Sequence, residues 1–280
     1  MVDNVVDHQF GSVGDALAKS IPPDKLLSDY LRKGAGAWLN AIPASQGFAF
    51  KPCDFRLASL VRLGLPISLS HWSEACNCSA PLDDSGYHLL TCKTGGGPIW
   101  SHESIAGVWS ECLRSLQIHH RREPRNRYVT SDCRPDIVMF DSESASNLDL
   151  DISLAHPWSA DAFPSSADRT GVAAKQRENR KAAKYSQQKL PGTSVLKAIP
   201  LVFEHFGAWG EEARNFLRKL AAFSSDEVGQ PNAPEFVDFW RKRFSVQLQK
   251  CNARVIQKKL NVLCGGCQIP ESLSTQFFYH

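Results

Sequence analysis

The chain has 280 residues, 42% of them hydrophobic and 22% charged, which fits one or two globular domains and excludes a wholly disordered protein. It contains no run of 18 apolar residues, and its first twenty residues carry three aspartates and no apolar stretch. These features argue against a membrane span and a secretory signal, so we expect an intracellular protein. The formal net charge of +3 excludes no class of partner by itself.

The N-terminal part of the sequence predicts short helices. Two are expected between residues 13 and 33, separated by a pair of prolines, and an amphipathic helix is expected over 53–64. A segment rich in cysteine and histidine follows at 76–92. The three glycines and the proline at 95–98 predict a hinge before the next part of the chain.

Beyond that hinge the apolar pattern alternates between helical spacing and strand spacing. The strand over 148–154 follows a strict period of two. The predicted fold class is α/β (α+β), a small mixed β-sheet flanked by helices. The predicted elements are helices over 105–116, 171–189, 207–223 and 235–260, and strands over 137–140, 148–154 and 198–206.

Nine cysteines in a chain of this length are too few for a disulfide scaffold, and the number is odd, so we interpret them as reduced thiols. Four isolated ones are interpreted as small apolar side chains. Cys264 and Cys267 form a separate pair. This pair could complete a second zinc site, act as a redox-sensitive tail, or remain without a ligand. The four isolated cysteines are Cys53, Cys112, Cys133 and Cys251.

A zinc site is predicted in the segment 76–92. Cys76, Cys78, His88 and Cys92 supply three thiolates and one imidazole as two close pairs joined by a turn-like loop. Zinc prefers four such ligands in a tetrahedron, and a closed site of this kind is structural. We therefore expect it to hold shape or contact nucleic acid. The alternative is a chance cluster of buried thiols.

A group of carboxylates is predicted at neighbouring strands. Asp136 stands at the start of one strand, and a hairpin brings it beside Asp149 or Asp151 of the next. The period of two puts both later acids on one face with Ser153. Converging carboxylates bind Mg²⁺ or Mn²⁺, which activates water for phosphodiester hydrolysis. The alternative is a solvated strand face.

Basic residues cluster on both sides of these acids in the sequence. Segment 118–134 contains five arginines against Glu123 and Asp132, and segment 241–259 contains seven Lys or Arg and no acid. A phosphate backbone is the partner that such clusters favour. The residues expected to contact nucleic acid are Arg121, Arg122, Arg125, Arg127, Arg241, Lys242 and Arg243.

Several motifs occur together in one order along the chain. They are Gly36 to Pro43, the Cys76/Cys78/His88/Cys92 segment, Arg134-Pro135-Asp136, Asp151-Ile152-Ser153, and the tail segments 239–243 and 252–254. With these motifs the sequence resembles the region downstream of the reverse transcriptase in metazoan non-LTR retrotransposons, over most of residues 30 to 260. In that region a CCHC zinc knuckle precedes a restriction-enzyme-like endonuclease of the PD-(D/E)XK class.

The resemblance implies a division of the chain and a location. The expected parts are a helical region that follows the reverse transcriptase (1–70), the zinc knuckle (71–98), a restriction-endonuclease-like core (99–225), and a basic helix with its tail (226–280). No Asp-Asp motif of a polymerase palm occurs, so we expect a fragment, a degenerate copy or a co-opted gene. The implied partner is DNA, or the RNA of the element, and the implied location is the nucleus.

The resemblance also implies residue roles. Asp136 corresponds to the first acid and Asp151 to the second, with Asp149 and Glu123 as further magnesium ligands. The class usually carries a lysine two residues after the second acid, where this sequence has Ser153. In retroelements that lysine commonly moves to the following helix, so the candidates here are Lys175, Lys181 and Lys184.

Two principal functions follow from these observations. The first is a metal-dependent DNA endonuclease with a structural zinc ion and catalytic Mg²⁺ or Mn²⁺. The second is a catalytically inactive module that binds nucleic acid and keeps the fold and the zinc knuckle. A third interpretation is a protein-interaction domain in which the zinc ion only stabilises the fold.

Overall fold

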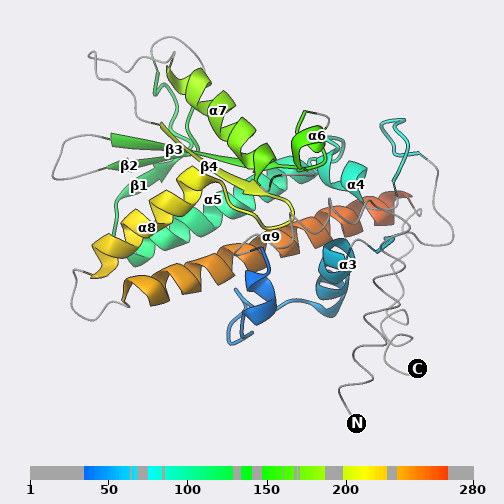
Figure 1. Ribbon diagram of the computed structural model, residues 1–280, viewed down its shortest axis with the longest axis horizontal. Coiled ribbons are helices and arrows are strands. Elements are labelled where there is room, and N and C mark those ends of the chain that lie inside the picture. The colour runs from blue at the N-terminus through cyan, green and yellow to red at the C-terminus, as the bar shows by residue number, and fades with distance from the viewer. Residues whose placement is uncertain are drawn as a thin grey trace.

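The computed structural model describes residues 35–63, 65–67, 75–83, 86–128, 134–140, 147–159, 161–166, 169, 171–186, 198–225 and 232–263 (Figure 1). The helices expected between 13 and 33, Cys133, and the Cys264/Cys267 pair lie outside these residues. The elements are η1 (Ala37–Asn40), α3 (Pro52–Leu63), α4 (Tyr87–Thr91), α5 (Gly97–Ser115), β1 (His120–Arg122), β2 (Ile137–Phe140), β3 (Asn147–Ala155), α6 (Phe163–Ser166), α7 (Val172–Ser186), β4 (Ala198–Glu204), α8 (Glu211–Ser225) and α9 (Ala233–Leu263).

The expected mixed sheet flanked by helices is confirmed. Four strands lie in the order β1-β2-β3-β4, antiparallel except for the parallel pair β3 and β4. Helix α7 connects those two parallel strands and covers one face of the sheet, and α5, α8 and α9 cover the other (Figure 1). The described helices include none that is long and apolar enough to cross a bilayer.

The larger core lies between the sheet and α5, α8 and α9. Trp109 of α5 is fully buried at its centre, and its ring lies 4.4 Å from the Phe244 ring and 5.5 Å from the Phe216 ring, measured between centroids. Leu150 and Ile152 of β3 point into the same cluster. The opposite face of β3 packs against α7 through small side chains, Ala173 and Ala174, which allow a close approach.

Helix α9 joins two hydrophobic clusters. Its first half, including Phe236 and Phe244, belongs to the core under the sheet. Its second half, including Ile256 and Leu260, packs with α3 and α4. Helix α9, which lies in the part of the chain expected as a separate basic helix and tail (226–280), therefore contributes to the packing of both clusters.

Two local predictions need correction. The expected hinge is instead the start of α5, because Gly95 and Gly96 turn the chain with φ of 82° and 72°, and Pro98 occupies the first turn of the helix. Gly97 lies against α9, where a Cβ would come within 2.8 Å of the Val255 side chain. Strand β1 was not predicted, since its three residues, His-Arg-Arg, carry no apolar pattern.

Candidate functional site

The four predicted zinc ligands converge. Cys78 Sγ lies 3.3 Å from His88 Nε2 and 3.7 Å from Cys92 Sγ, and Cys92 Sγ lies 3.9 Å from Cys76 Sγ. All four ligand atoms lie within 4.8 Å of one another. Tetrahedral bonds of about 2.0 to 2.3 Å place ligand atoms about 3.5 to 4 Å apart, so this group could hold a zinc ion.

Local backbone contacts hold the ligands in place. The amide of Ser79 donates to Cys76 O, and the amide of Cys76 donates to Ala80 O, which closes a tight turn around the first pair. Asp83 accepts hydrogen bonds from the first amides of α4, including that of His88 at 2.7 Å. The amide of Cys92 donates to His88 O at 2.8 Å, so this short helix fixes the second pair.

The electrostatic surroundings of the two buried thiols differ. Burial raises the pKa of the Cys76 thiol. Burial acts in the same direction on Cys92, but hydrogen bonds from Thr94 and the nearby Lys259 outweigh it and lower its pKa to about 6. Lys259 reaches the site from α9 and donates to Cys92 O at 2.8 Å. A thiol that is ionised at neutral pH is the form that binds metal.

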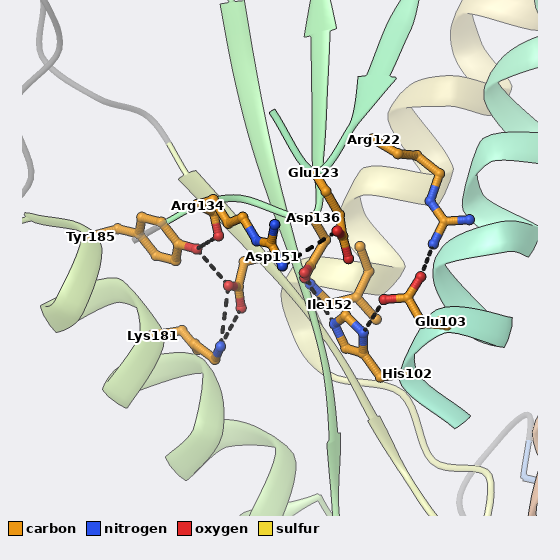
Figure 2. Close-up of polar contacts among 10 residues, drawn as sticks. All are labelled: His102, Glu103, Arg122, Glu123, Arg134, Asp136, Asp151, Ile152, Lys181 and Tyr185. Carbon is orange, nitrogen blue, oxygen red and sulfur yellow. Dashed lines mark hydrogen bonds and ion pairs between the residues drawn. The ribbon is translucent and has the colours of Figure 1, made fainter. Parts of the chain in front are cut away.

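The predicted acid Asp136 immediately precedes β2, and Asp151 lies in the neighbouring strand β3. Ile137 is the residue opposite Leu150, so Asp136 and Asp151 occupy the next position along the ladder. The Asp136 carboxylate accepts a hydrogen bond from the Ile152 amide of β3 at 2.5 Å (Figure 2). It also turns toward α5, where it lies 3.1 Å from His102 Nε2. The hydrogen bond from His102 to Asp136 raises the pKa of this histidine.

The Asp151 carboxylate turns toward α7. Lys181 Nζ lies 2.8 Å from Asp151 Oδ2 and 3.1 Å from Oδ1, and the Tyr185 hydroxyl donates to Oδ1 at 2.5 Å (Figure 2). Lys181 and Tyr185 are four residues apart and therefore share one face of the helix. Because Asp151 is only 4% exposed, Lys181 and Tyr185 rather than water compensate its negative charge.

The other candidates of this group have different neighbours. Asp149 is fully buried and bound by Arg127 at 2.9 Å and by the Tyr128 hydroxyl at 2.7 Å. Glu123 Oε2 lies 3.4 Å from Arg134. Lys175 is exposed and lies 3.3 Å from Glu211. Among the described acids, no three offer oxygen atoms that converge on one point.

The lysine at 184 and the basic clusters also have identifiable positions. Lys184 lies on the exposed side of α7, with its ammonium 5.8 Å from the Tyr185 ring centroid. Arg121 and Arg125 are exposed beside the sheet, and Arg122 pairs with Glu103. In α9 all three predicted contacts already have acidic partners. Arg241 and Lys242 lie 2.5 and 2.6 Å from Asp238, and Arg243 lies 2.9 Å from Glu111.

Sequence reasoning missed His102 and the role of Tyr185. His102 belongs to the first turns of α5, in the segment next to the expected hinge, and lies 34 positions before Asp136. A histidine followed by a glutamate on a helix is too common a pattern to single out. A scan against known protein families and a search of curated proteins found no match for this chain. We therefore infer function from the geometry of the two sites.

Proposed function

We propose that the protein is a metal-dependent endonuclease module that hydrolyses DNA phosphodiesters and carries a structural zinc ion. The observation that supports it best is the position of Lys181. Ser153 stands where the PD-(D/E)XK pattern has its lysine, and α7 brings an ammonium 2.8 Å from the second acid, Asp151. The first acid, Asp136, immediately precedes the adjacent strand β2 and donates its amide to Leu150 O of β3 at 3.0 Å.

The donor set fits a hard divalent cation. Asp136 and Asp151 offer carboxylate oxygens, and Mg²⁺ is commonly held by one or two carboxylates while water fills its other positions. Such an ion, when bound, would activate water for attack on phosphorus. Lys181 would stabilise the negative charge that develops on the phosphate oxygens. His102 and Tyr185 fix the orientation of the two carboxylates.

A second candidate is the catalytically inactive module that binds nucleic acid. It is favoured by one observation, namely that both carboxylates already have partners within the protein. Asp136 is engaged by His102 and a backbone amide, and Asp151 by Lys181 and Tyr185. Charged groups balanced in this way can serve the stability of the fold alone.

Cleavage of supercoiled plasmid in Mg²⁺ or Mn²⁺ separates the two candidates. We expect the wild type to nick the plasmid and Asp136→Asn and Asp151→Asn to lose the activity while keeping their zinc. Asp161→Asn is the matched control, because Asp161 is exposed and pairs only with Arg180 among the described residues. DNA binding without cleavage by the wild type would establish the inactive module. Equal cleavage by the wild type and all three variants would show that Asp136 and Asp151 are not catalytic residues.

A further inference from the structure

A pocket of about 370 Å³ lies between the second half of α9, the start of α5 and the first cysteine pair of the knuckle. One wall is apolar and consists of Trp100, Val255 and Val262. Three cations, Arg254, Lys258 and Lys259, also line the pocket, and no acidic side chain does so among the described residues. Cys76 of the zinc-ligand cluster borders the pocket, whereas neither acid of the carboxylate pair lines it.

The cations differ in how free they are to meet a ligand. Lys259 turns inward and is held by Cys92 O at 2.8 Å. Lys258 is exposed, and its ammonium lies 3.4 Å from Gly95 O. The guanidinium of Arg254 lies 5.8 Å from the Trp100 ring centroid, and its Nε lies 3.4 Å from the buried carboxylate of Asp54. Arg254 and Lys258 therefore present positive charge next to a large aromatic surface.

The backbone adds to this charge. Gly97, which begins the 19-residue helix α5, lines the pocket, and the N-terminus of a helix carries partial positive charge. Asn77 contributes a side-chain amide at the rim, with both a donor and an acceptor. An anionic group at the mouth and a flat apolar group inside would satisfy all of these features together.

We propose that this pocket binds one nucleotide of a single-stranded nucleic acid. Its base packs against the Trp100 indole, and its phosphate lies between Arg254 and Lys258. A base in a duplex is stacked on both sides and must leave the stack to pack against Trp100 in this pocket, so single strands are preferred. Stacking of a base on an aromatic side chain contributes about 1–3 kcal/mol and tolerates any sequence.

The pocket lies close to the carboxylates in the fold. Trp100 and His102 are two residues apart on α5, so they point to nearly opposite sides of the same helical turn. His102 faces Asp136, and Trp100 faces α9. If the proposed nuclease activity holds, a strand held at Trp100 would be anchored about one helix diameter from the acids.

Fluorescence anisotropy with a labelled oligodeoxythymidylate tests the pocket without any divalent cation, so the result does not depend on cleavage. We expect Trp100→Ala to weaken binding about tenfold and Trp100→Phe to weaken it less. The neighbouring residue Ile99 is 71% exposed and does not line the pocket, so Ile99→Ala should bind as the wild type does. The same oligonucleotide in duplex form should bind more weakly and be insensitive to Trp100.

Lys258 gives a second measurement that does not risk the fold, because it is exposed. Lys258→Ala should lower the slope of log affinity against log salt by about 0.7, the value for one phosphate of a single strand. Lys219→Ala on α8, also exposed, is the control and should leave the slope unchanged. The proposal would be overturned if Trp100→Ala and Lys258→Ala both kept the affinity and the salt slope of the wild type. It would also be overturned if the wild type did not bind the single strand. If Trp100→Ala fails to fold, the salt slope of Lys258→Ala tests the proposal by itself, and an unchanged slope overturns it.

Discussion

The zinc-ligand cluster and the carboxylate pair differ in what balances their charge. In the cluster, the thiols of Cys76, Cys78 and Cys92 lie within 4 Å of another ligand atom, and Lys259 is the cation that contacts Cys92. In the carboxylate pair, Lys181 lies against Asp151, and His102 lies against Asp136. We therefore expect a bound metal ion to stabilise the first group, whereas the acids of the second group have charged partners within the protein.

The largest expected effect follows from removing a zinc ligand. Cys78→Ser should abolish the stoichiometric zinc and lower the free energy of unfolding by several kcal/mol, since structural zinc sites bind with roughly 10–16 kcal/mol in isolated fingers. Metal analysis and urea denaturation measure the two effects. Cys53→Ser is the matched control, because Cys53 belongs to α3 and is outside the cluster. Retention of zinc and stability by Cys78→Ser would show that these four residues are not a metal site.

The next largest effect concerns Lys181. We expect its substitution to change the rate of plasmid cleavage rather than the free energy of unfolding. Lys181→Met is expected to slow plasmid cleavage about 100-fold, as removal of one charge-stabilising group commonly does. Its zinc content should not change, because the knuckle is separate from α7. Lys175→Met is the control on the same helix, since Lys175 is exposed and pairs with Glu211. Equal slowing by both substitutions would indicate a general loss of positive charge on α7 and would contradict a specific role for Lys181.

The smallest effect comes from a third group of side chains, two histidines beside the knuckle. His156 and His205 are buried with ring centroids 5.2 Å apart, and the His156 ring lies 4.7 Å from that of Tyr87, which precedes the ligand His88. Burial lowers the pKa of both, that of His205 to about 4. They stay neutral when folded, whereas the unfolded chain protonates them below a pH of about 6.5.

These two histidines should therefore add no pH dependence to the free energy of unfolding above that pH, and should lower this free energy as the pH decreases toward 4. The slope is at most about 1.4 kcal/mol per pH unit for each histidine. His205→Gln removes one of these two titrating groups, so it should reduce the slope of unfolding free energy against pH by up to about 1.4 kcal/mol per pH unit. Urea denaturation at several pH values between 7 and 5 measures this slope. The predicted zinc ligands also bind protons in this pH range, but they do so in both proteins. Their contribution therefore cancels in the difference between the slopes of His205→Gln and the wild type. An unchanged slope would show that His205 is not the group that titrates.

The two sites also differ in how far the sequence predicts them. The four predicted zinc ligands lie within one short segment, so their spacing alone indicates that they converge. The strand that follows Asp136 and the strand that contains Asp151 are predicted by apolar periodicity, and β2 has the predicted bounds. The partners of these acids come from α5 and α7, and their identity depends on how helices dock on the sheet, which no local pattern encodes.

Burial of the acidic strand face was equally inaccessible to sequence reasoning. Alternation in β3 correctly separates Asp149 and Asp151 from Leu150, but it suggests a face open to solvent as readily as a covered one. The cover is α7, whose Ala173 and Ala174 pack closely against the sheet. The Arg127 and Tyr128 contacts that neutralise Asp149 come from a turn with no regular structure, so no periodicity could reveal them.

The shared helix α9 has a consequence for the order of folding during translation. Trp38 donates its amide to Ser245, and Lys250 donates to Gln46 O, across separations of 207 and 204 residues. At about 5–20 residues per second, the ribosome needs roughly 10 to 40 seconds to extend the chain from one partner to the other. Trp38, which is only 3% exposed in the finished protein, stays without its contacts to α9 for that interval. Residues 35–63 are thus a stretch of the nascent chain that a chaperone would have to protect until α9 is made.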